Sequence, residues 1–175
     1  MKRFMSLIII LILLVFIAGI FPSIITNAST GNHAEIDIKV YYPLYNDVGT
    51  VYLNRKVCFH PENNIEKFFE DIFKSPPSDK LIHPVSFNTD INNIFLDETN
   101  MVLRVDFSQE FLSHMNAGSS MEWEIIRSIV NTLGEFFKTQ KVYISIEGSP
   151  YESEHYALRE GEYFLADLTD IEEFK

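Results

Sequence analysis

Histidine and cysteine side chains are the first candidates for metal binding or nucleophilic catalysis in this sequence. The histidines are His33, His60, His83, His114 and His155. No two of them lie four residues apart on a predicted helix and none clusters with cysteine, so the spacing does not predict a zinc site. The single cysteine, Cys58, lies two residues before His60 on a predicted strand, where both side chains point to the same side. A histidine base can activate a thiol, but we predict an inert, partly buried Cys58.

Paired carboxylates are the second candidate chemistry, because two acids can serve as proton donor and base in glycan hydrolysis. The acids considered are Asp97, Glu98, Asp106, Glu110, Glu122 and Glu124. Asp106 follows a predicted strand and leads into a helix start, which predicts a capping role. The sequence contains no glycine-rich phosphate loop, no Gly-x-Ser-x-Gly motif and no Ser-x-x-Lys motif with its companions. We therefore predict a protein that is not an enzyme, with no catalytic residues, no cofactor and no metal ion.

An apolar leader precedes the elements that must position any site. Two basic residues come before an uncharged apolar run from Phe4 to Ile25, which is long enough to cross a bilayer and favours a cytoplasmic N-terminus. Thr26-Asn27-Ala28 also forms a small-residue cleavage site for a signal peptide. Both alternatives, a retained anchor and cleavage near Ala28, stay open. In either case we predict an extracytoplasmic protein, which is single-pass and membrane-anchored or is secreted.

Composition limits the partners and the fold. The leader contributes +2 to the formal net charge of −11, which leaves −13 for the rest of the chain. This acidity repels nucleic acid and suits solubility, a basic partner or cations. A single cysteine excludes an internal disulfide, so the fold must rest on its core. The 15 phenylalanines and eight tyrosines argue against disorder and predict such a core.

Period-two alternation of apolar residues predicts the strands. They cover residues 36–42, 50–59, 93–97, 100–107 and 142–146. On the strand over residues 100–107, the alternation places Met101, Leu103, Val105 and Phe107 on the buried face and Val102, Arg104 and Asp106 on the other. Ser108 then caps a short helical turn.

Apolar residues at helical spacing predict a helix over residues 65–73. Asn63 is its predicted cap, with Glu66 three residues on, and Ser75-Pro76 ends it because proline disfavours helix at the preceding residue.

A second helix is predicted over residues 119–137 by the same spacing. Ser119 and Glu122 form its predicted capping box. Gly134 inside it costs about 1 kcal/mol relative to alanine on helix propensity alone.

The order of elements is β-β-α-β-β-α-β, which predicts an α+β fold. One mixed sheet with both helices packed on one face buries both apolar stripes most economically. The predicted parts are a leader (1–28), a linker (29–35), an α+β domain (36–150) and an acidic C-terminal extension (151–175). The extension carries several aromatic residues, so we expect part of it to pack onto the domain.

Several segments together resemble the GerMN domain family, which is named for bacterial sporulation and spore germination. They are Phe68-Phe69 to Pro76, Leu81 to Val85, Ile94 to Leu96, Met101 to Ser108 with Phe111, Ile129 to Leu133, and Val142 to Gly148. The chain departs from the family in having one copy where some members have two, in lacking a lipid-bearing cysteine, and in having Ser75-Pro76 where Gly-Pro is usual.

The resemblance implies an extracytoplasmic domain whose fold is similar to the ring-building modules of sporulation and secretion assemblies. It brings no catalytic residues. The family-motif residues to which it gives structural roles are Pro76, Asp106, Ser108, Asn131, Thr132 and Gly148.

Three functions follow as hypotheses. The first is a scaffold that contacts other envelope or sporulation proteins and allows an oligomer. The second is a module that binds peptidoglycan, in which Tyr41, Trp123, Tyr143 and the aromatic residues of the extension stack on sugars. The third is an acid-dependent wall hydrolase. The leader attaches the first two to the membrane if it is not cleaved, and none of the three involves nucleic acid.

Overall fold

The computed structural model describes residues 34–59, 64–115 and 117–175. The predicted leader and most of the predicted linker therefore lie outside the described residues, as do His33, His60 and the predicted cap Asn63. Within the described ranges, no helix has the length and apolarity that crossing a membrane requires.

A first sheet is built on a long antiparallel hairpin. β1 (Ala34–Pro43) pairs with β2 (Thr50–Phe59) over their whole length. β8 (Glu172–Glu173), near the C-terminus, lies parallel to β2 beside Val51 and Tyr52. Ile38, Val40 and Tyr42 of β1 are buried in the core, as the alternation predicts. Tyr41, on the opposite face, is buried too, because α4 covers it.

A second sheet contains the remaining strands, in the order β3-β4-β5-β6 with β7 also paired to β5. They are β3 (Ile91–Asp97), β4 (Val102–Phe107), β5 (Lys141–Ile146), β6 (Ser149–Pro150) and β7 (Phe164–Leu165). β3 and β4 are antiparallel, whereas β4 and β5 are parallel and joined by the helical segment between them.

The prediction of a single sheet is wrong, and the contacts at the strand edges give the reason. The Tyr41 N–H of β1 donates to the hydroxyl of Thr132 on a helix, at 3.0 Å. The Ile91 and Ile94 N–H groups of β3 donate to the carboxylates of Glu70 and Glu66 on another helix, both at 3.0 Å. Helix side chains thus satisfy backbone groups that would otherwise pair with a further strand.

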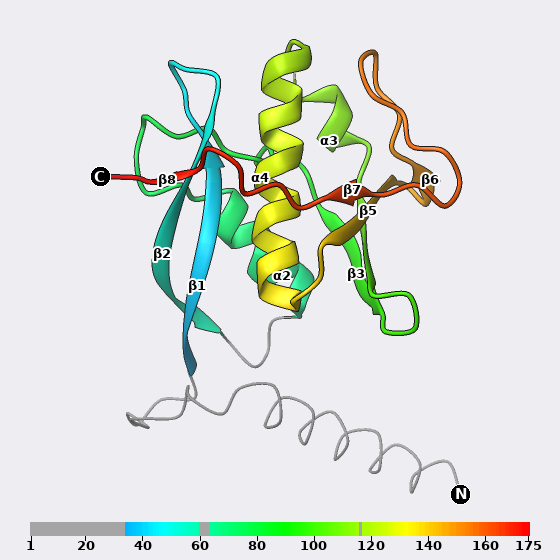
Figure 1. Ribbon diagram of the computed structural model, residues 1–175, viewed down its shortest axis with the longest axis horizontal. Helices are drawn as coiled ribbons and strands as arrows, with labels where there is room; N and C mark the ends of the chain where they lie inside the picture. Colours follow the sequence, from blue (N-terminus) through cyan, green and yellow to red (C-terminus); the bar gives the residue numbers. More distant parts are fainter. Residues whose placement is uncertain (1–33, 60–63, 116) are drawn as a thin grey trace, which may run out of the picture.

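The helices are α2 (Ile65–Phe73), α3 (Glu110–Ser113) and α4 (Ser119–Phe137). In Figure 1, α4 runs between the β1–β2 hairpin and the second sheet, with α2 behind it. The aromatic stripe of α2 meets α4 directly, because the rings of Phe69 and Phe136 lie edge to face with centroids 5.0 Å apart. One continuous core therefore joins both sheets and both long helices.

Both predicted helix starts need correction. Asn64 caps α2 by accepting from the Lys67 N–H, and Glu66 binds β3 rather than closing a capping box. Gly118 is the N-cap of α4, with no side-chain cap, so the Ser119–Glu122 box does not form. The physical reason is competition: the carboxylates of Glu66 and Glu122 have partners in distant segments, which a local pattern does not reveal.

The alternation also predicts the wrong position for Met101, which was expected on the buried face of a strand. It lies in the turn between β3 and β4 with a positive φ of 52° and is 46% exposed. Leu103, Val105 and Phe107 are fully buried as predicted.

Candidate functional site

Asp106 fixes the turn that follows β5. Its Oδ1 accepts from the Ser145 hydroxyl at 2.6 Å and from the Gly148 N–H at 2.8 Å, and its Oδ2 accepts from the Asn92 amide at 3.0 Å. Asp106 therefore does not cap the following helix, because β5, the turn after it and β3 supply its donors. Glu147 and Gly148 both have positive φ, 49° and 79°, which suits a two-residue hairpin turn.

Ser108 and Pro76 hold chain connections. Ser108 accepts from the Asp90 N–H through its hydroxyl at 3.0 Å and donates its own N–H to the Asp90 carbonyl at 2.9 Å. Gln109, not Ser108, occupies the N-cap of α3, and its side chain makes no capping bond. Pro76 follows the Lys74 C-cap of α2 at the position where the sequence ends that helix.

Asn131 and Thr132 lie fully buried on α4 and face different segments. Asn131 donates to the Asp167 carbonyl at 2.6 Å and accepts the Asp167 N–H at 2.8 Å, so its amide pairs with that backbone as a strand would. Thr132 accepts the Tyr41 N–H and donates to the Ser128 carbonyl at 2.8 Å. These two residues join the C-terminal extension and β1 to the same helix.

Glu122 is the most deeply engaged of the candidate acids. It is 3% exposed and accepts from the Tyr151 hydroxyl at 2.7 Å and from the Ser153 hydroxyl at 2.5 Å. Burial and these carboxylate contacts raise the pKa of Tyr151 above its ordinary value, so this phenol stays a hydrogen-bond donor. His155 reaches Glu122 only at 4.0 Å. The cluster ties the start of α4 to the segment after β6.

Cys58 is exposed, contrary to the partly buried position predicted for it. It lies near the end of β2, and His60 is outside the described residues. Over the described ranges, no group of three or more His, Cys, Asp or Glu side chains is arranged to hold a metal ion.

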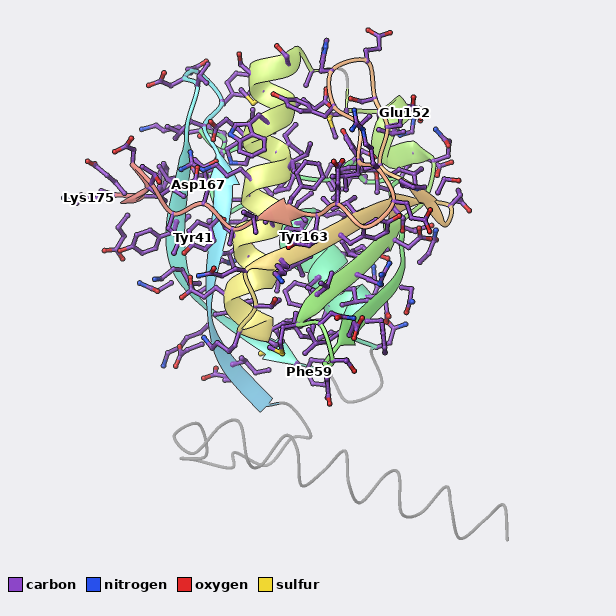
Figure 2. All side chains as sticks on the ribbon, turned by 45° about the vertical axis from the view of Figure 1, so that its right-hand side comes forward. Tyr41, Phe59, Glu152, Tyr163, Asp167 and Lys175 are labelled. Carbon is purple, nitrogen blue, oxygen red and sulfur yellow. The ribbon has the colours of Figure 1, made fainter. Side chains whose placement is uncertain are left out.

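A hollow of about 300 Å³ lies on the outer face of the second sheet, and we call it the sheet hollow. Its lining includes Asp97, Asn100, Arg104, Lys141, Tyr143 and Tyr163. The ladder brings Arg104 of β4 opposite Tyr143 of β5, and the guanidinium lies 4.8 Å from the tyrosine ring centroid. The Lys141 ammonium lies 5.1 Å from the Tyr163 ring centroid. Figure 2 shows Tyr163 on the tail segment that crosses over α4.

The sequence revealed only part of this hollow. Alternation placed Arg104 on the outer face of its strand, and Tyr143 and Tyr163 belong to the aromatic residues predicted to stack on sugars. The pairing of β4 with β5 brings Arg104 to Tyr143, and the pairing of β7 with β5 brings Tyr163 to Lys141. Alternation within a single strand carries no signal of its neighbour. The other tyrosine and the tryptophan proposed for stacking lie elsewhere: Tyr41 is 2% exposed, and Trp123 is half-buried beside Tyr156.

Two neighbouring loop segments also expose large apolar side chains. Tyr45 and Val48 of the β1–β2 turn are 65% and 64% exposed, Phe87 of the loop between α2 and β3 is 74% exposed, and we call these three residues the loop end. Backbone contacts hold its two segments together, because the Tyr45 N–H donates to the Lys80 carbonyl at 2.8 Å. Phe87 packs its ring against His83.

Known proteins were compared with this chain by family, sequence and structure. The family model Germane, described as sporulation and spore germination, matches residues 39–152. No curated protein matches the chain. The tandem GerMN domains of the sporulation protein GerM from Bacillus subtilis are similar in structure, with a TM-score of 0.55 and 18% identity, over 81% of this chain and 48% of that one.

The first GerMN domain of the same Bacillus subtilis protein matches with a TM-score of 0.48 and 17% identity, over 73% of this chain and 97% of that one. The present chain thus spans about half the length of the tandem structure. At 18% and 17% sequence identity, the similarity between this chain and these structures concerns the fold alone.

Proposed function

The chain belongs to the Germane family of sporulation and spore-germination domains, and from this we propose that it is a non-catalytic module that contacts other envelope or sporulation proteins outside the cytoplasmic membrane. The resemblance to GerMN domains predicted from the sequence is confirmed. The family match over residues 39–152 is the observation that carries the proposal.

The roles of the acidic side chains support a non-catalytic module. Glu122 is held by Tyr151 and Ser153, Glu124 accepts from the Thr50 hydroxyl at 2.6 Å, and Asp106 fixes a turn. Each of these carboxylates makes the bonds that a structural role requires. Glu122 and Glu124 lie near the start of α4, and Asp106 lies on β4. These contacts favour a structural role for the three carboxylates over a catalytic pair of acid and base.

The proposed location rests on the leader. A retained anchor would hold the domain close to the outer surface of the membrane, and cleavage near Ala28 would release it. Protease added to intact cells, after removal of the wall, should digest the domain, and mass spectrometry of the mature N-terminus separates the two alternatives. Digestion only after lysis would contradict an outer location.

The loop end is the surface through which the proposed contact with other proteins would occur. Tyrosine and phenylalanine are enriched in protein interfaces, and here they project from two segments fixed to each other. Cross-linking in sporulating cells, followed by mass spectrometry, should recover specific envelope proteins with the wild-type chain. The double variant Tyr45→Ala/Phe87→Ala should reduce that recovery at least tenfold.

Leu168→Ala is the matched control, because Leu168 is 57% exposed and lies away from both loop-end segments in sequence. Its recovery should equal that of the wild type. If the wild-type chain recovers no envelope protein, the proposed function fails. Equal recovery with the double variant would instead move the contact to another surface.

A further inference from the structure

The sheet hollow brings two cationic side chains together on an acidic protein. Arg104 and Lys141 each lie over a tyrosine ring, and within the described residues neither forms an ion pair. The tyrosine rings stabilise these cations through their π faces and restrict their positions. Asp97 and Glu162 of the same lining balance the two charges, so an anionic group would be bound there by direct contact with Arg104 and Lys141 rather than by a surplus of positive charge.

The hollow also presents acceptors that are already ordered. Asp97 accepts from the Asn100 amide at 2.9 Å and from the Thr99 N–H at 3.1 Å. The Asn100 side chain, the Asn100 and Thr99 N–H groups and the charge of Arg104 hold the pKa of Asp97 below its usual range. Glu162 accepts the Arg159 N–H at 2.8 Å. The two carboxylates therefore stand as fixed acceptors beside the cations.

Aromatic rings give the hollow a flat apolar component. Tyr163 is 36% exposed at its edge. Phe95 of β3 is 56% exposed and pairs in register with Arg104, so the row Phe95, Arg104 and Tyr143 crosses the sheet. Such rings bury apolar surface at little cost in side-chain entropy.

This combination selects among ligand classes. The centre of a protein interface is depleted of charged residues, whereas this hollow has two cations and two carboxylates. The net negative charge repels nucleic acid. A pyranose ring has apolar C–H faces and hydroxyl groups that both donate and accept, and a carboxylate on such a sugar would meet the cations.

We propose that the sheet hollow binds a carboxylate-bearing saccharide. The ring of Tyr163 covers a C–H face of the sugar, Arg104 and Lys141 bind the carboxylate, and Asp97 and Glu162 accept from hydroxyl groups. This activity goes beyond the contact with proteins proposed above and uses a different surface.

The test measures binding of the full chain, purified in detergent, to insoluble peptidoglycan whose stem peptides have been removed by an amidase, because the lactyl carboxylate is amide-bonded to the peptide in the intact polymer. Single sugars are then added as competitors. N-acetylmuramic acid and N-acetylglucosamine make a matched pair, because the first differs from the second by a carboxylate-bearing lactyl group. We expect the chain to sediment with peptidoglycan and N-acetylmuramic acid to displace it at a concentration at least tenfold lower than N-acetylglucosamine. Glucuronic acid is a third arm, which distinguishes a wall glycan from an acidic capsular polymer as the source.

Variants assign the binding to the hollow. Arg104→Gln/Lys141→Gln removes both charges and should lower retention at least tenfold. Tyr163→Ala should lower it by a similar factor, whereas Tyr163→Phe keeps the ring and should retain binding. Leu168→Ala, at an exposed residue outside the lining of the hollow, should bind like the wild type, and urea unfolding shows that each variant is folded.

Three results would overturn the assignment: no sedimentation of the wild type with any acidic glycan, equal retention of the charge variant, or equal competition by the neutral sugar. Loss of cross-linked envelope protein in the hollow variants, without any glycan binding, would make the hollow a protein interface and also overturn it. Failure of the loop-end experiment leaves this result unaffected, because the two experiments use different variants and ligands.

Discussion

Gly134 lies inside α4 at a point where another backbone approaches closely. A Cβ built there would lie 2.8 Å from the Thr139 carbonyl oxygen, and the Thr139 N–H donates to the Gly134 carbonyl at 2.9 Å. Helix propensity alone predicts that Gly134→Ala stabilises the protein by about 1 kcal/mol. The contact predicts the opposite, a loss of about 1–3 kcal/mol, because backbone cannot move aside as a side chain can.

Urea unfolding of the wild type and of Gly134→Ala shows whether the substitution stabilises or destabilises the protein. Gly118→Ala is the matched control, because a Cβ at Gly118 meets nothing within 4 Å. That variant should change the unfolding free energy by only a few tenths of a kcal/mol to about 1 kcal/mol. A stabilised Gly134→Ala variant would show that the chain after α4 is held less tightly than the contact implies.

Glu70 gives the protein a specific sensitivity to acid. It is 7% exposed, accepts the Ile91 N–H at 3.0 Å, and pairs with Lys74 at 3.1 Å. Burial raises the pKa of Glu70, but the bond from Ile91 and the charge of Lys74 outweigh it, so the folded-state pKa lies below the ordinary value. A depressed pKa stabilises the fold above the unfolded-state value of about 4.3, and that contribution disappears as the pH falls through the folded-state pKa.

Glu70→Gln should therefore lower the unfolding free energy at pH 7 by about 1–3 kcal/mol, and the difference from wild type should shrink as the pH approaches 3. Urea unfolding at several pH values measures it. A difference that stays constant from pH 7 to pH 3 would mean that the ionised carboxylate is not what joins α2 to β3.

The residues that sequence patterns misplaced have partners far along the chain. Ser119 and Glu122 have the spacing of a capping box, yet Glu122 binds Tyr151 and Ser153. The spacing was visible in the sequence, whereas these competing donors were not. A buried carboxylate needs hydrogen-bond donors, and Glu122 has them in the Tyr151 and Ser153 hydroxyls rather than at the helix start.

At the scale of elements, Asn131 and Thr132 make α4 the common support of two segments. Asn131→Ala would leave the Asp167 N–H without its acceptor, and we expect it to cost about 1–3 kcal/mol. Its clearest effect should be faster hydrogen exchange at the Asp167 amide, with the Tyr41 amide unchanged.

Thr132→Val gives the reciprocal experiment, because it keeps the shape and removes the acceptor of the Tyr41 N–H. Exchange at the Tyr41 amide should accelerate, and exchange at the Asp167 amide should not. If both variants accelerate both amides equally, the extension and β1 unfold from α4 as one unit, and the separate roles assigned to these neighbours are wrong.

Period-two and helical spacing predicted the main strands and both long helices, because each pattern reports the burial of one face of a single element. The division into two sheets was not predictable in this way. It depends on Thr132, Glu66 and Glu70 reaching the edges of β1 and β3, and on the parallel pairing of β4 with β5. The sheet hollow depends on the same pairing.

At the scale of the whole molecule, the C-terminal extension connects the two sheets. β7 pairs with β5 in the second sheet, the segment around Asp167 crosses α4, and β8 pairs with β2 in the first. Figure 2 shows Tyr163, Asp167 and Lys175 following one another across the molecule. At these contacts with α4, α2 and the extension, the edges of β1, β3 and β2 are thus occupied, which limits edge-to-edge association there.

A chain ending at Leu165 tests this role, because it keeps β7 and removes every later contact. Arg127 would lose its bonds to the Asp167 and Thr169 carbonyls, and Tyr52 would lose the Phe174 N–H at 2.9 Å. Ordering the extension costs entropy, so we expect a net loss of about 2–4 kcal/mol rather than the sum of its bonds.

The amides whose hydrogen exchange accelerates show whether the extension connects the two sheets. Hydrogen exchange should accelerate both in β2, at Tyr52, and on α4, around Arg127, because the removed segment binds each of them. In the part of the chain that the structure describes, neither β3 nor β4 pairs with a strand after Leu165, so the amides of this ladder should accelerate only through global unfolding. Unchanged stability, or acceleration confined to one sheet, would mean that the extension lies on a domain that holds its two sheets together without it.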